Sequence, residues 1–232
     1  VFDLLGCSVM PSARFSGFSF PPRLALLAGL TSVLLASTPL QAQNSQPPGP
    51  VLSPADERAF ATCLNSLRSQ AAEKGVRGAT FDAHAMPLVP DMTVLDLLDA
   101  QPEFVTPIWD YLAGLVDEER VADGREMLAR WDEVLRAVET QYRVDPATVV
   151  AVWGVESNFG RNFGSRPLLT SLSTLSCFGR RQPFFRGEFF TTLKIIQDGD
   201  VAPERLTGSW AGAFGHTQFM PSTFMRLAVD FD

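Results

Sequence analysis

The sequence predicts a mainly α-helical domain with a groove lined by loops. Three observations support this fold class. Apolar residues recur at intervals of three and four over most of the chain, which is the period of an amphipathic helix. Helix start signals, such as Ser53-Pro54 and Asp145-Pro146, precede several of these stretches. No alternating strand pattern extends beyond a few residues, and a glycine-rich segment at 208–220 has no period and indicates an ordered loop.

The first 42 residues are typical of a secretory signal. Arg14 and Arg23 precede a short apolar run at 24–35, and Ala42 offers a small residue for cleavage. The run is too short to span a bilayer comfortably, although an uncleaved anchor is the alternative. Residues 43–52 are polar and proline-rich, so we expect a flexible linker there. This leaves 53–232 as the folded domain.

The helices of this domain follow from caps and apolar stripes in chain order. They are expected from Pro54 to about Lys74, near 93–100, from Pro107 through Leu115, over about 121–142, between Pro146 and Gly160, near 168–176, over 182–197 and from Pro221 to Val229. Only three residues, Asp230-Phe231-Asp232, follow the last helix. We therefore expect the natural chain to be longer, with the C-terminal part of the domain missing here.

Charge and cysteine content narrow the function classes. The net charge of −7 and the pI near 4.9 argue against nucleic acid as a partner, because phosphate binding needs a basic face. Removal of the signal would leave Cys63 and Cys177, which either form a disulfide in an oxidising compartment or stay as two buried thiols. The chain has two histidines, neither beside a cysteine, so it offers little for a zinc cluster or a Cys/His nucleophile.

Glu156 is the candidate acid. It lies near the end of an otherwise apolar helix, VVAVWGVES, at a spacing that places it on one face with Val149, Val152 and Trp153. We expect this face to point toward a core or a cleft wall. Desolvation and the partial negative charge of the helix C-terminus would then raise the pKa of the carboxyl group, as a general acid requires. A buried structural glutamate is the alternative.

Two further stretches combine groups that suit a polysaccharide. The run GSWAGAFGHTQFMPS at 208–222 joins glycines, which allow close approach of a ligand, to three aromatic rings and neutral hydrogen-bonding groups. Arg180-Arg181, flanked by aromatic residues, could clamp a carboxylate or a carbonyl group. A packed structural loop and a solvated arginine pair are the alternatives for these two stretches.

Together the three stretches resemble the B-type lytic murein transglycosylases, periplasmic enzymes that cleave bacterial peptidoglycan. The resemblance extends from about Phe60 to Asp232 and is most specific in the glycine-rich run. It implies a lysozyme-like helical domain, with Glu156 as the single catalytic acid/base. The substrate-binding residues that it implies are Ser209, Gln218, Arg180, Arg181, Ser157, Phe159 and Phe219. His216 stands where the family varies, so no catalytic role is assigned to it.

The implied reaction cleaves the β-1,4 bond between N-acetylmuramic acid and N-acetylglucosamine and leaves a 1,6-anhydro end. A lone acid suits this chemistry, because the substrate supplies its own attacking hydroxyl, whereas ordinary glycosidases use two carboxylates. A muramidase that uses water and a non-catalytic wall-binding module are the alternative functions. No cofactor is required by this mechanism.

The resemblance also implies where the protein works and with what. We expect a periplasmic monomer that acts on peptidoglycan glycan strands, with cell-wall synthesis complexes as candidate partners. Asp230 and Asp232 look like the start of a calcium loop that some members carry. Calcium needs six to eight oxygen ligands, so this site would be complete only in a longer chain.

Overall fold

The computed structural model describes residues 52–99 and 105–229. The expected signal at 1–42, the linker up to residue 51, and Asp230 and Asp232 lie outside the described residues. All described residues belong to one compact unit. Within these ranges every helix is too short or too polar to cross a bilayer.

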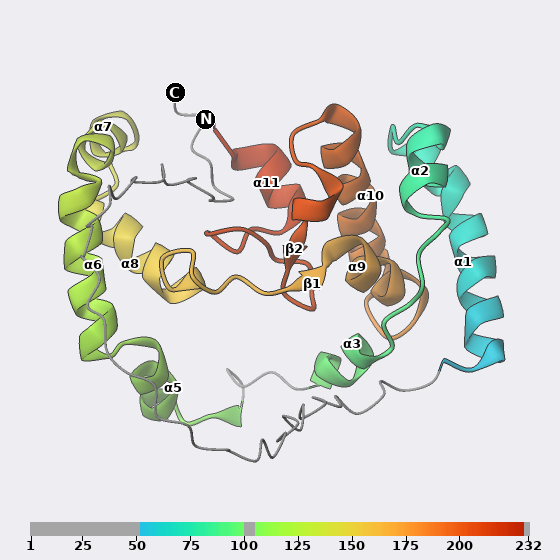
Figure 1. Ribbon diagram of the computed structural model, residues 1–232, viewed down its shortest axis with the longest axis horizontal. Helices are drawn as coiled ribbons and strands as arrows, with labels where there is room; N and C mark the ends of the chain where they lie inside the picture. The colour runs from blue at the N-terminus through green and yellow to red at the C-terminus, as the bar shows by residue number, and fades with distance from the viewer. Residues whose placement is uncertain (1–51, 100–104, 230–232) are drawn as a thin grey trace, which may run out of the picture. The chain divides into compact units, whose positions relative to one another are not determined.

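Helices dominate the described chain (Figure 1). In chain order the elements are α1 (Pro54–Glu73), α2 (Gly78–His84), α3 (Thr93–Asp96), η1 (Leu97–Asp99), α5 (Ile108–Leu115), α6 (Glu118–Arg130), α7 (Asp132–Tyr142), α8 (Pro146–Ser157), β1 (Arg166–Pro167), α9 (Leu168–Cys177), α10 (Gln182–Asp198), η2 (Pro203–Arg205), β2 (Thr207–Gly208) and α11 (Pro221–Leu227). The mainly helical fold class predicted from the sequence is confirmed.

Helix α1 forms as its sequence signals predict. The Ser53 hydroxyl accepts a hydrogen bond from the backbone N–H of Asp56 at 3.1 Å, which caps the helix, and Pro54 occupies the first turn. The stripe of Phe60, Leu64 and Leu67 is buried, as expected for an amphipathic helix. The sequence pattern therefore predicted both the start and the buried face of this helix correctly.

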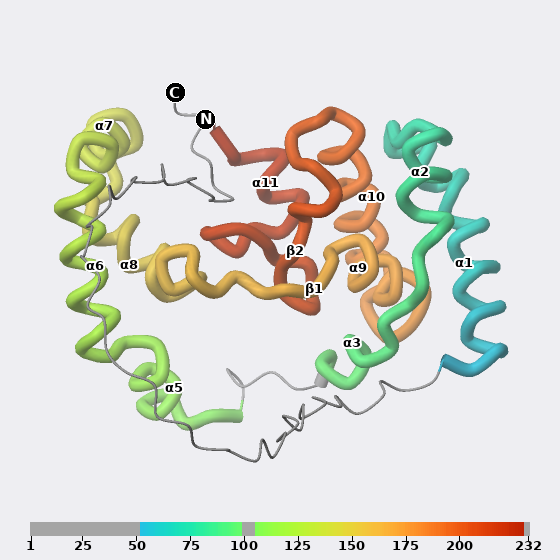
Figure 2. The backbone as a smooth tube through the Cα atoms, in the orientation of Figure 1, coloured from blue at the N-terminus to red at the C-terminus, as the bar shows by residue number. Residues whose placement is uncertain are grey.

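A large hydrophobic cluster contains α1, α2, α9 and α10. Helices α9 and α10 lie side by side along much of their length (Figure 2). The buried residues of this cluster include Leu172 from α9 and Phe189 and Leu193 from α10. Cys63 of α1 and Cys177 of α9 form a disulfide with a Cα–Cα distance of 5.8 Å. Of the two alternatives for these cysteines, the structure therefore has the disulfide and not two free thiols.

A second, smaller cluster holds α6, α7 and α8 together. Its buried members are Met127, Leu135, Val150 and Phe159. Trp153 and Trp131 are partly buried against it. This cluster is what supports the helix that carries Glu156.

The structure corrects the predicted helix at 121–142. Two helices, α6 and α7, replace it, and the chain leaves helical geometry at Trp131, where φ is −108° and ψ is 18°. No glycine or proline marks the break, so the 3.6-residue period continued across it. Asp132 and Glu133 then fill the first turn of α7, where the helix dipole favours negative charge. The short helix α2 was not predicted.

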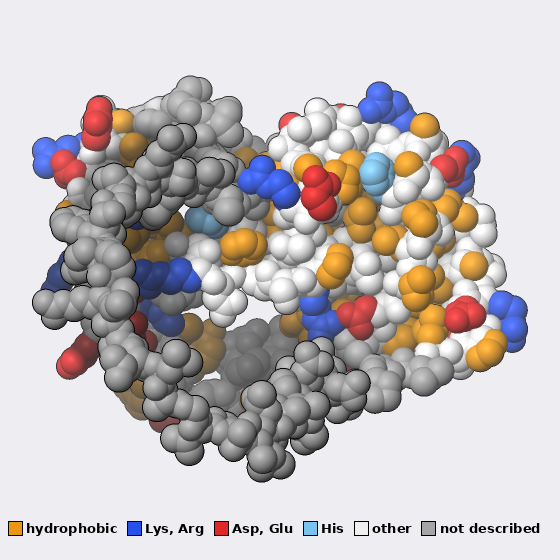
Figure 3. Space-filling view, viewed as in Figure 1, with side chains coloured by type: hydrophobic (Ala, Val, Ile, Leu, Met, Phe, Trp, Pro, Cys, Tyr) orange, Lys and Arg blue, Asp and Glu red, His pale blue; other side chains and the backbone are white. Residues whose placement is uncertain are grey.

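Charged side chains of both signs are interspersed on the face of the described chain that Figure 3 shows.

Candidate active site

The glycine-rich loop (208–220) is a compact turn structure that begins at strand β2. Strand β2 pairs antiparallel with β1, with Arg166 opposite Gly208. Bridges from Phe214 to Gly208 and to Phe219 fold the loop back on itself. The Ser209 backbone N–H donates to the carbonyl of Ala213 at 2.8 Å, and the N–H of Ala213 donates to the Ser209 hydroxyl at 3.0 Å. These bonds give the loop one defined conformation.

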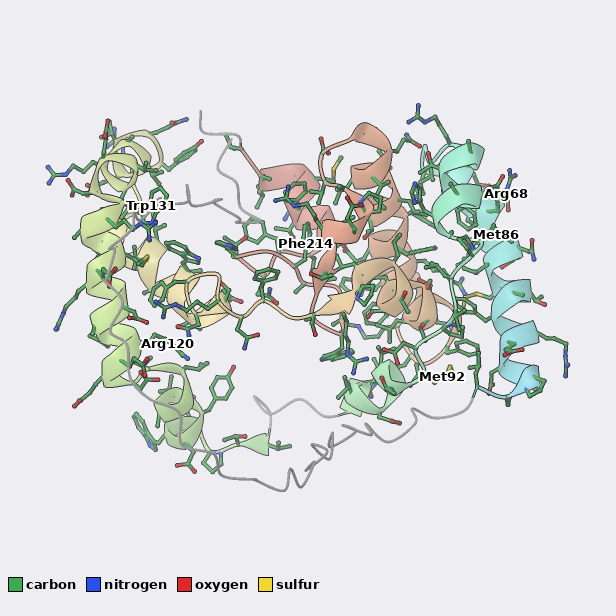
Figure 4. All side chains as sticks on the ribbon, viewed as in Figure 1. Arg68, Met86, Met92, Arg120, Trp131 and Phe214 are labelled. Atoms are coloured by element: carbon green, nitrogen blue, oxygen red, sulfur yellow. A yellow bond between two sulfur atoms is a disulfide. The ribbon has the colours of Figure 1, made fainter. Side chains whose placement is uncertain are left out.

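Phe214 anchors the loop in the large hydrophobic cluster (Figure 4). Its buried ring packs against Phe224 of α11, with the ring centroids 5.3 Å apart. Gly212, at φ +97°, approaches α9 so closely that a Cβ atom there would lie 2.6 Å from Leu172. The glycine is therefore needed both for backbone conformation and for close packing.

Loop 208–220 and the start of α10 enclose a pocket of about 620 Å³. Its lining residues are Leu98, Arg180, Arg181, Phe184, Phe185, Trp210, Ala211 and Met220. The structure thus brings together two of the three stretches singled out in the sequence, the arginine pair and the glycine-rich run. Aromatic rings and guanidinium groups at one opening can bind a ligand that has both apolar faces and acidic or carbonyl oxygens.

The two arginines are held differently. Arg180 donates to the backbone carbonyl of Leu98 at 2.6 Å, which ties the pocket rim to η1. Arg181 places its guanidinium over the ring of Phe184, with 4.7 Å from Cζ to the ring centroid. Arg181 also has a left-handed backbone (φ +61°), an unfavourable conformation for a residue with a side chain. Strained residues of this kind cluster at binding sites.

Helix α8 presents Glu156 one residue before its end. The Asp145 carboxylate accepts from the N–H of Thr148 at 3.1 Å, so the predicted cap is confirmed. Three consecutive residues after the helix are left-handed: Asn158, Phe159 and Gly160, with φ of 48°, 58° and 81°. The chain therefore turns sharply directly after Glu156.

The predicted inward face of α8 is wrong for Glu156 and Val152, whereas Val149 and Trp153 of that face pack partly buried against the smaller cluster. Glu156 is exposed, as is Val152, and the buried residues of the helix are Val150, Gly154 and Ser157. Valines occur on all sides of this helix, so the apolar pattern could not tell which side packs on α6 and α7. The carboxylate lacks the apolar surroundings that were expected, and no hydrogen bond or ion pair to another described residue engages it.

Ser157 and Phe159, which were predicted to bind substrate, are both buried. Ser157 is 1% exposed, and its hydroxyl donates to the carbonyl of His216 at 2.7 Å and accepts from the N–H of Gly160 at 3.0 Å. The ring of Phe159 packs against Gly154, where a Cβ atom would lie 2.8 Å from it. The hydrogen bonds of Ser157 and the packing of Phe159 on Gly154 hold the backbone turn that follows Glu156.

The other predicted binding residues lie in the loop itself. The side-chain amide of Gln218 donates to the carbonyls of Phe163 and Gly215, at 3.0 and 2.9 Å, and so closes the loop against the segment that follows α8. Ser209 and Phe219 are half-buried. None of these three residues lines the pocket at the arginine pair.

His216 connects the glycine-rich loop to the turn at 158–160 that directly follows Glu156, which we call the Glu156 turn. Its ring stacks on Trp153, with centroids 5.8 Å apart and an interplanar angle of 15°, and lies 5.9 Å from the ring of Phe163. Burial lowers the pKa of its imidazole, because desolvation disfavours the charged form. The neutral ring is therefore favoured at this contact.

Two residues important for the site were not predicted. Leu98 lines the pocket, and nothing in its local pattern marked it. Glu188 of α10 is 5% exposed and accepts from the N–H and the hydroxyl of Ser222, at 2.9 and 2.7 Å. It holds the start of α11, and with it Met220, against α10. Its helix also contains Arg186, Lys194 and Asp198, so nothing in the sequence marked Glu188 as buried.

Within residues 52–99 and 105–229, no group of three or more His, Cys, Asp or Glu side chains could hold a metal ion. The two aspartates proposed as the start of a calcium loop lie outside these ranges.

Comparison with known proteins identifies the family of the chain. The family model of the transglycosylase SLT domain matches residues 59–232. A curated relative, the membrane-bound lytic murein transglycosylase B of Escherichia coli strain K12, is 36% identical over 122 residues, which are 52% of this chain and 34% of the relative.

Solved structures show the same fold. SltB3 from Pseudomonas aeruginosa in complex with NAG-NAM-pentapeptide has a TM-score of 0.71 and 42% identity, over 75% of this chain and 46% of that one. Slt35 from Escherichia coli in complex with calcium has a TM-score of 0.64 and 29% identity, over 76% and 56% of the two chains. The chain thus spans between about a third and just over half the length of these relatives.

These matches confirm the family and the lysozyme-like helical fold that the motifs indicated. The family model covers most of the chain, including α8, the arginine pair and the glycine-rich loop. The chain therefore belongs to the transglycosylase SLT domain family.

Proposed function

We propose that the chain is the catalytic part of a lytic transglycosylase that cleaves peptidoglycan between N-acetylmuramic acid and N-acetylglucosamine. One observation carries the proposal: an exposed carboxylate, Glu156, stands on a turn that Ser157 ties to the glycine-rich loop. The same loop forms the pocket with Arg180 and Arg181. Family membership and the SltB3 complex with NAG-NAM-pentapeptide support the same substrate class.

In the proposed mechanism Glu156 acts twice. As an acid it gives its proton to the glycosidic oxygen, and the bond from that oxygen to C1 of the muramic residue breaks. As a base it then accepts the proton of the C6 hydroxyl, whose oxygen bonds to C1 and closes the 1,6-anhydro ring. The carboxyl group ends protonated, as it began, and no water is consumed. The attacking hydroxyl belongs to the substrate, so its effective concentration is high.

The absence of a second acid from the glycine-rich loop supports this reaction over hydrolysis. Residues 208–220 contain no Asp or Glu, so the loop offers no carboxylate to activate a water or to form a glycosyl intermediate. The polar groups offered by the loop are Ser209 and Gln218, which we propose as donors to the sugar or its acetamido group. We propose that Phe219 offers an apolar face to a sugar ring. Arg180 and Arg181 would bind carboxylates of the peptide stem.

We also propose the location and partners of the protein. Export through the signal at 1–42 would place it in the periplasm, where its polymer lies, and the Escherichia coli relative named above is membrane-bound. Glycan strands are the proposed partner of a monomeric protein, with cell-wall synthesis complexes as further candidates. The reaction needs no cofactor, and a calcium site is proposed only for a longer chain that completes the ligands of Asp230 and Asp232.

The test compares the chain with Glu156→Gln on purified peptidoglycan, with released muropeptides weighed by mass spectrometry. We expect anhydro ends, one water lighter than reducing ends, and a loss of about 100-fold or more in their release by the variant. Reducing ends would indicate a muramidase. Equal release by the variant would show that Glu156 is not the acid. A wall-binding module would release neither product and would keep its biological function with Glu156→Gln.

A further inference from the structure

His216 contacts the Glu156 turn through both its ring and its backbone. The ring stacks on Trp153, one helical turn before Glu156, and lies against Phe163 beyond the turn. The His216 carbonyl accepts the hydroxyl hydrogen bond of Ser157, the residue directly after Glu156. One residue of the glycine-rich loop therefore fixes the backbone on both sides of the proposed acid.

Gly160 makes room for this contact. A Cβ atom at position 160 would lie 2.3 Å from Cε1 of His216 and 2.5 Å from its Nε2. Gly160 also donates its backbone N–H to the Ser157 hydroxyl at 3.0 Å. The imidazole thus lies on the backbone of the turn itself, with no side chain between them.

We propose that His216 is a positioning residue, which holds Glu156 at a fixed place relative to the glycine-rich loop through the flat surface of its ring. The inference rests on the proposed function. It assigns no proton transfer to the imidazole, because the ring is occupied by packing against Trp153, Phe163 and the Gly160 backbone. Any flat ring of similar size should serve the same purpose.

The expected signature is a loss of rate with little change in binding. Small displacements of a catalytic group lower the rate strongly, because reacting atoms must meet at the correct distance and angle. His216 does not line the pocket formed by Arg181 and Trp210, so substrate binding there should be unaffected. A loss of kcat at nearly constant KM separates positioning from general loosening of the fold.

The experiment uses the full chain and soluble glycan strands. His216→Ala removes the ring, and we expect kcat to fall about 10- to 100-fold with KM changed by less than about twofold. His216→Phe keeps a flat ring, and we expect it to retain at least about half of the activity. Circular dichroism of each variant at the assay temperature confirms that the protein is folded.

Glycine substitutions give a matched pair. Gly160→Ala, at φ +81°, introduces a methyl group into the space of the His216 ring. Gly199→Ala, at φ +83° after α10, brings the same backbone strain with no heavy atom within 4 Å of its Cβ. We expect Gly160→Ala to lower kcat as His216→Ala does and Gly199→Ala to leave it unchanged. The difference between the two isolates the collision with His216.

The outcomes separate this inference from the proposed function. If the unsubstituted chain releases no anhydromuropeptide, the proposed function fails and the role of His216 fails with it. If the chain is active and Glu156→Gln is not, while His216→Ala and Gly160→Ala keep full kcat, only the positioning role is wrong. A loss in His216→Phe as large as in His216→Ala would also overturn it, because chemistry of the imidazole would then be required.

Discussion

The two hydrophobic clusters support different parts of the candidate site, and they differ greatly in size. In the described residues the cluster around α1, α9 and α10 has 21 buried members, whereas the cluster of α6, α7 and α8 has four. The large cluster fixes the glycine-rich loop and the arginine pair. The small one carries Glu156. The helix that carries the proposed acid is therefore packed on the smaller cluster. Its position relative to the loop depends on the hydrogen bond between Ser157 and His216.

Truncation of one leucine in each cluster tests this comparison with equal chemistry. Leu193 of α10 is 0% exposed and Leu135 of α7 is 7% exposed. We expect Leu193→Ala to lower the free energy of unfolding by about 4 kcal/mol and Leu135→Ala by about 2 kcal/mol, because a crowded site relaxes less around a cavity. Urea unfolding followed by circular dichroism measures both values.

Hydrogen exchange sharpens the same test. Leu135→Ala should speed the exchange of amides in α6, α7 and α8 and leave α9 and α10 protected, since weakly packed elements open locally. Leu227→Ala, at an exposed position in α11, is the control and should change the free energy by less than about 0.5 kcal/mol. Equal costs for Leu135 and Leu193, with uniform exchange, would contradict the difference between the clusters.

The disulfide connects the stability of both clusters. Cys63 and Cys177 are 114 residues apart in sequence, and the loop between them contains α5 to α8. We expect the double substitution Cys63→Ser and Cys177→Ser to cost about 3 kcal/mol of unfolding free energy, because the unfolded chain gains freedom throughout this loop. Urea unfolding measures the cost. Reduced wild-type protein is the control, and its stability should match that of the double variant.

The sequence predicted local features of this molecule better than tertiary ones. The cap at Ser53, the stripe of α1 and the start of α8 follow from neighbouring residues and were correct. The break at Trp131 and the exposed side of α8 depend on packing between helices, which a run of valines does not specify. The pairing of the two cysteines stayed open for the same reason, because their distance is set by the packing of α1 on α9.

In the candidate site as well, the sequence indicated which stretches matter but not how their side chains are oriented. Family motifs located Glu156, the arginine pair and the glycine-rich loop, but motif spacing did not tell a buried side chain from an exposed one. Ser157 and Phe159 lie in the Glu156 motif and still face inward, where Ser157 donates to the His216 carbonyl and Phe159 packs on Gly154. His216, which the motif left without a role, makes contacts between the two stretches, as does Gln218.

The smallest expected effect is a pH dependence at that contact. Burial lowers the pKa of His216 in the folded chain below its ordinary value near 6.5. At a pH between these two pKa values, the imidazole is mostly protonated in the unfolded chain and mostly neutral in the folded chain. Stability from this residue is present above about pH 6.5 and is lost as the pH falls. The charged residues on the segment packed against the ring are Glu156 and Arg161, of which Arg161 pairs with Asp123. His216→Phe should lose less stability between pH 7.5 and 5 than wild type in urea unfolding. Identical losses would mean that the contact of His216 with the backbone around Glu156 does not depend on a neutral imidazole.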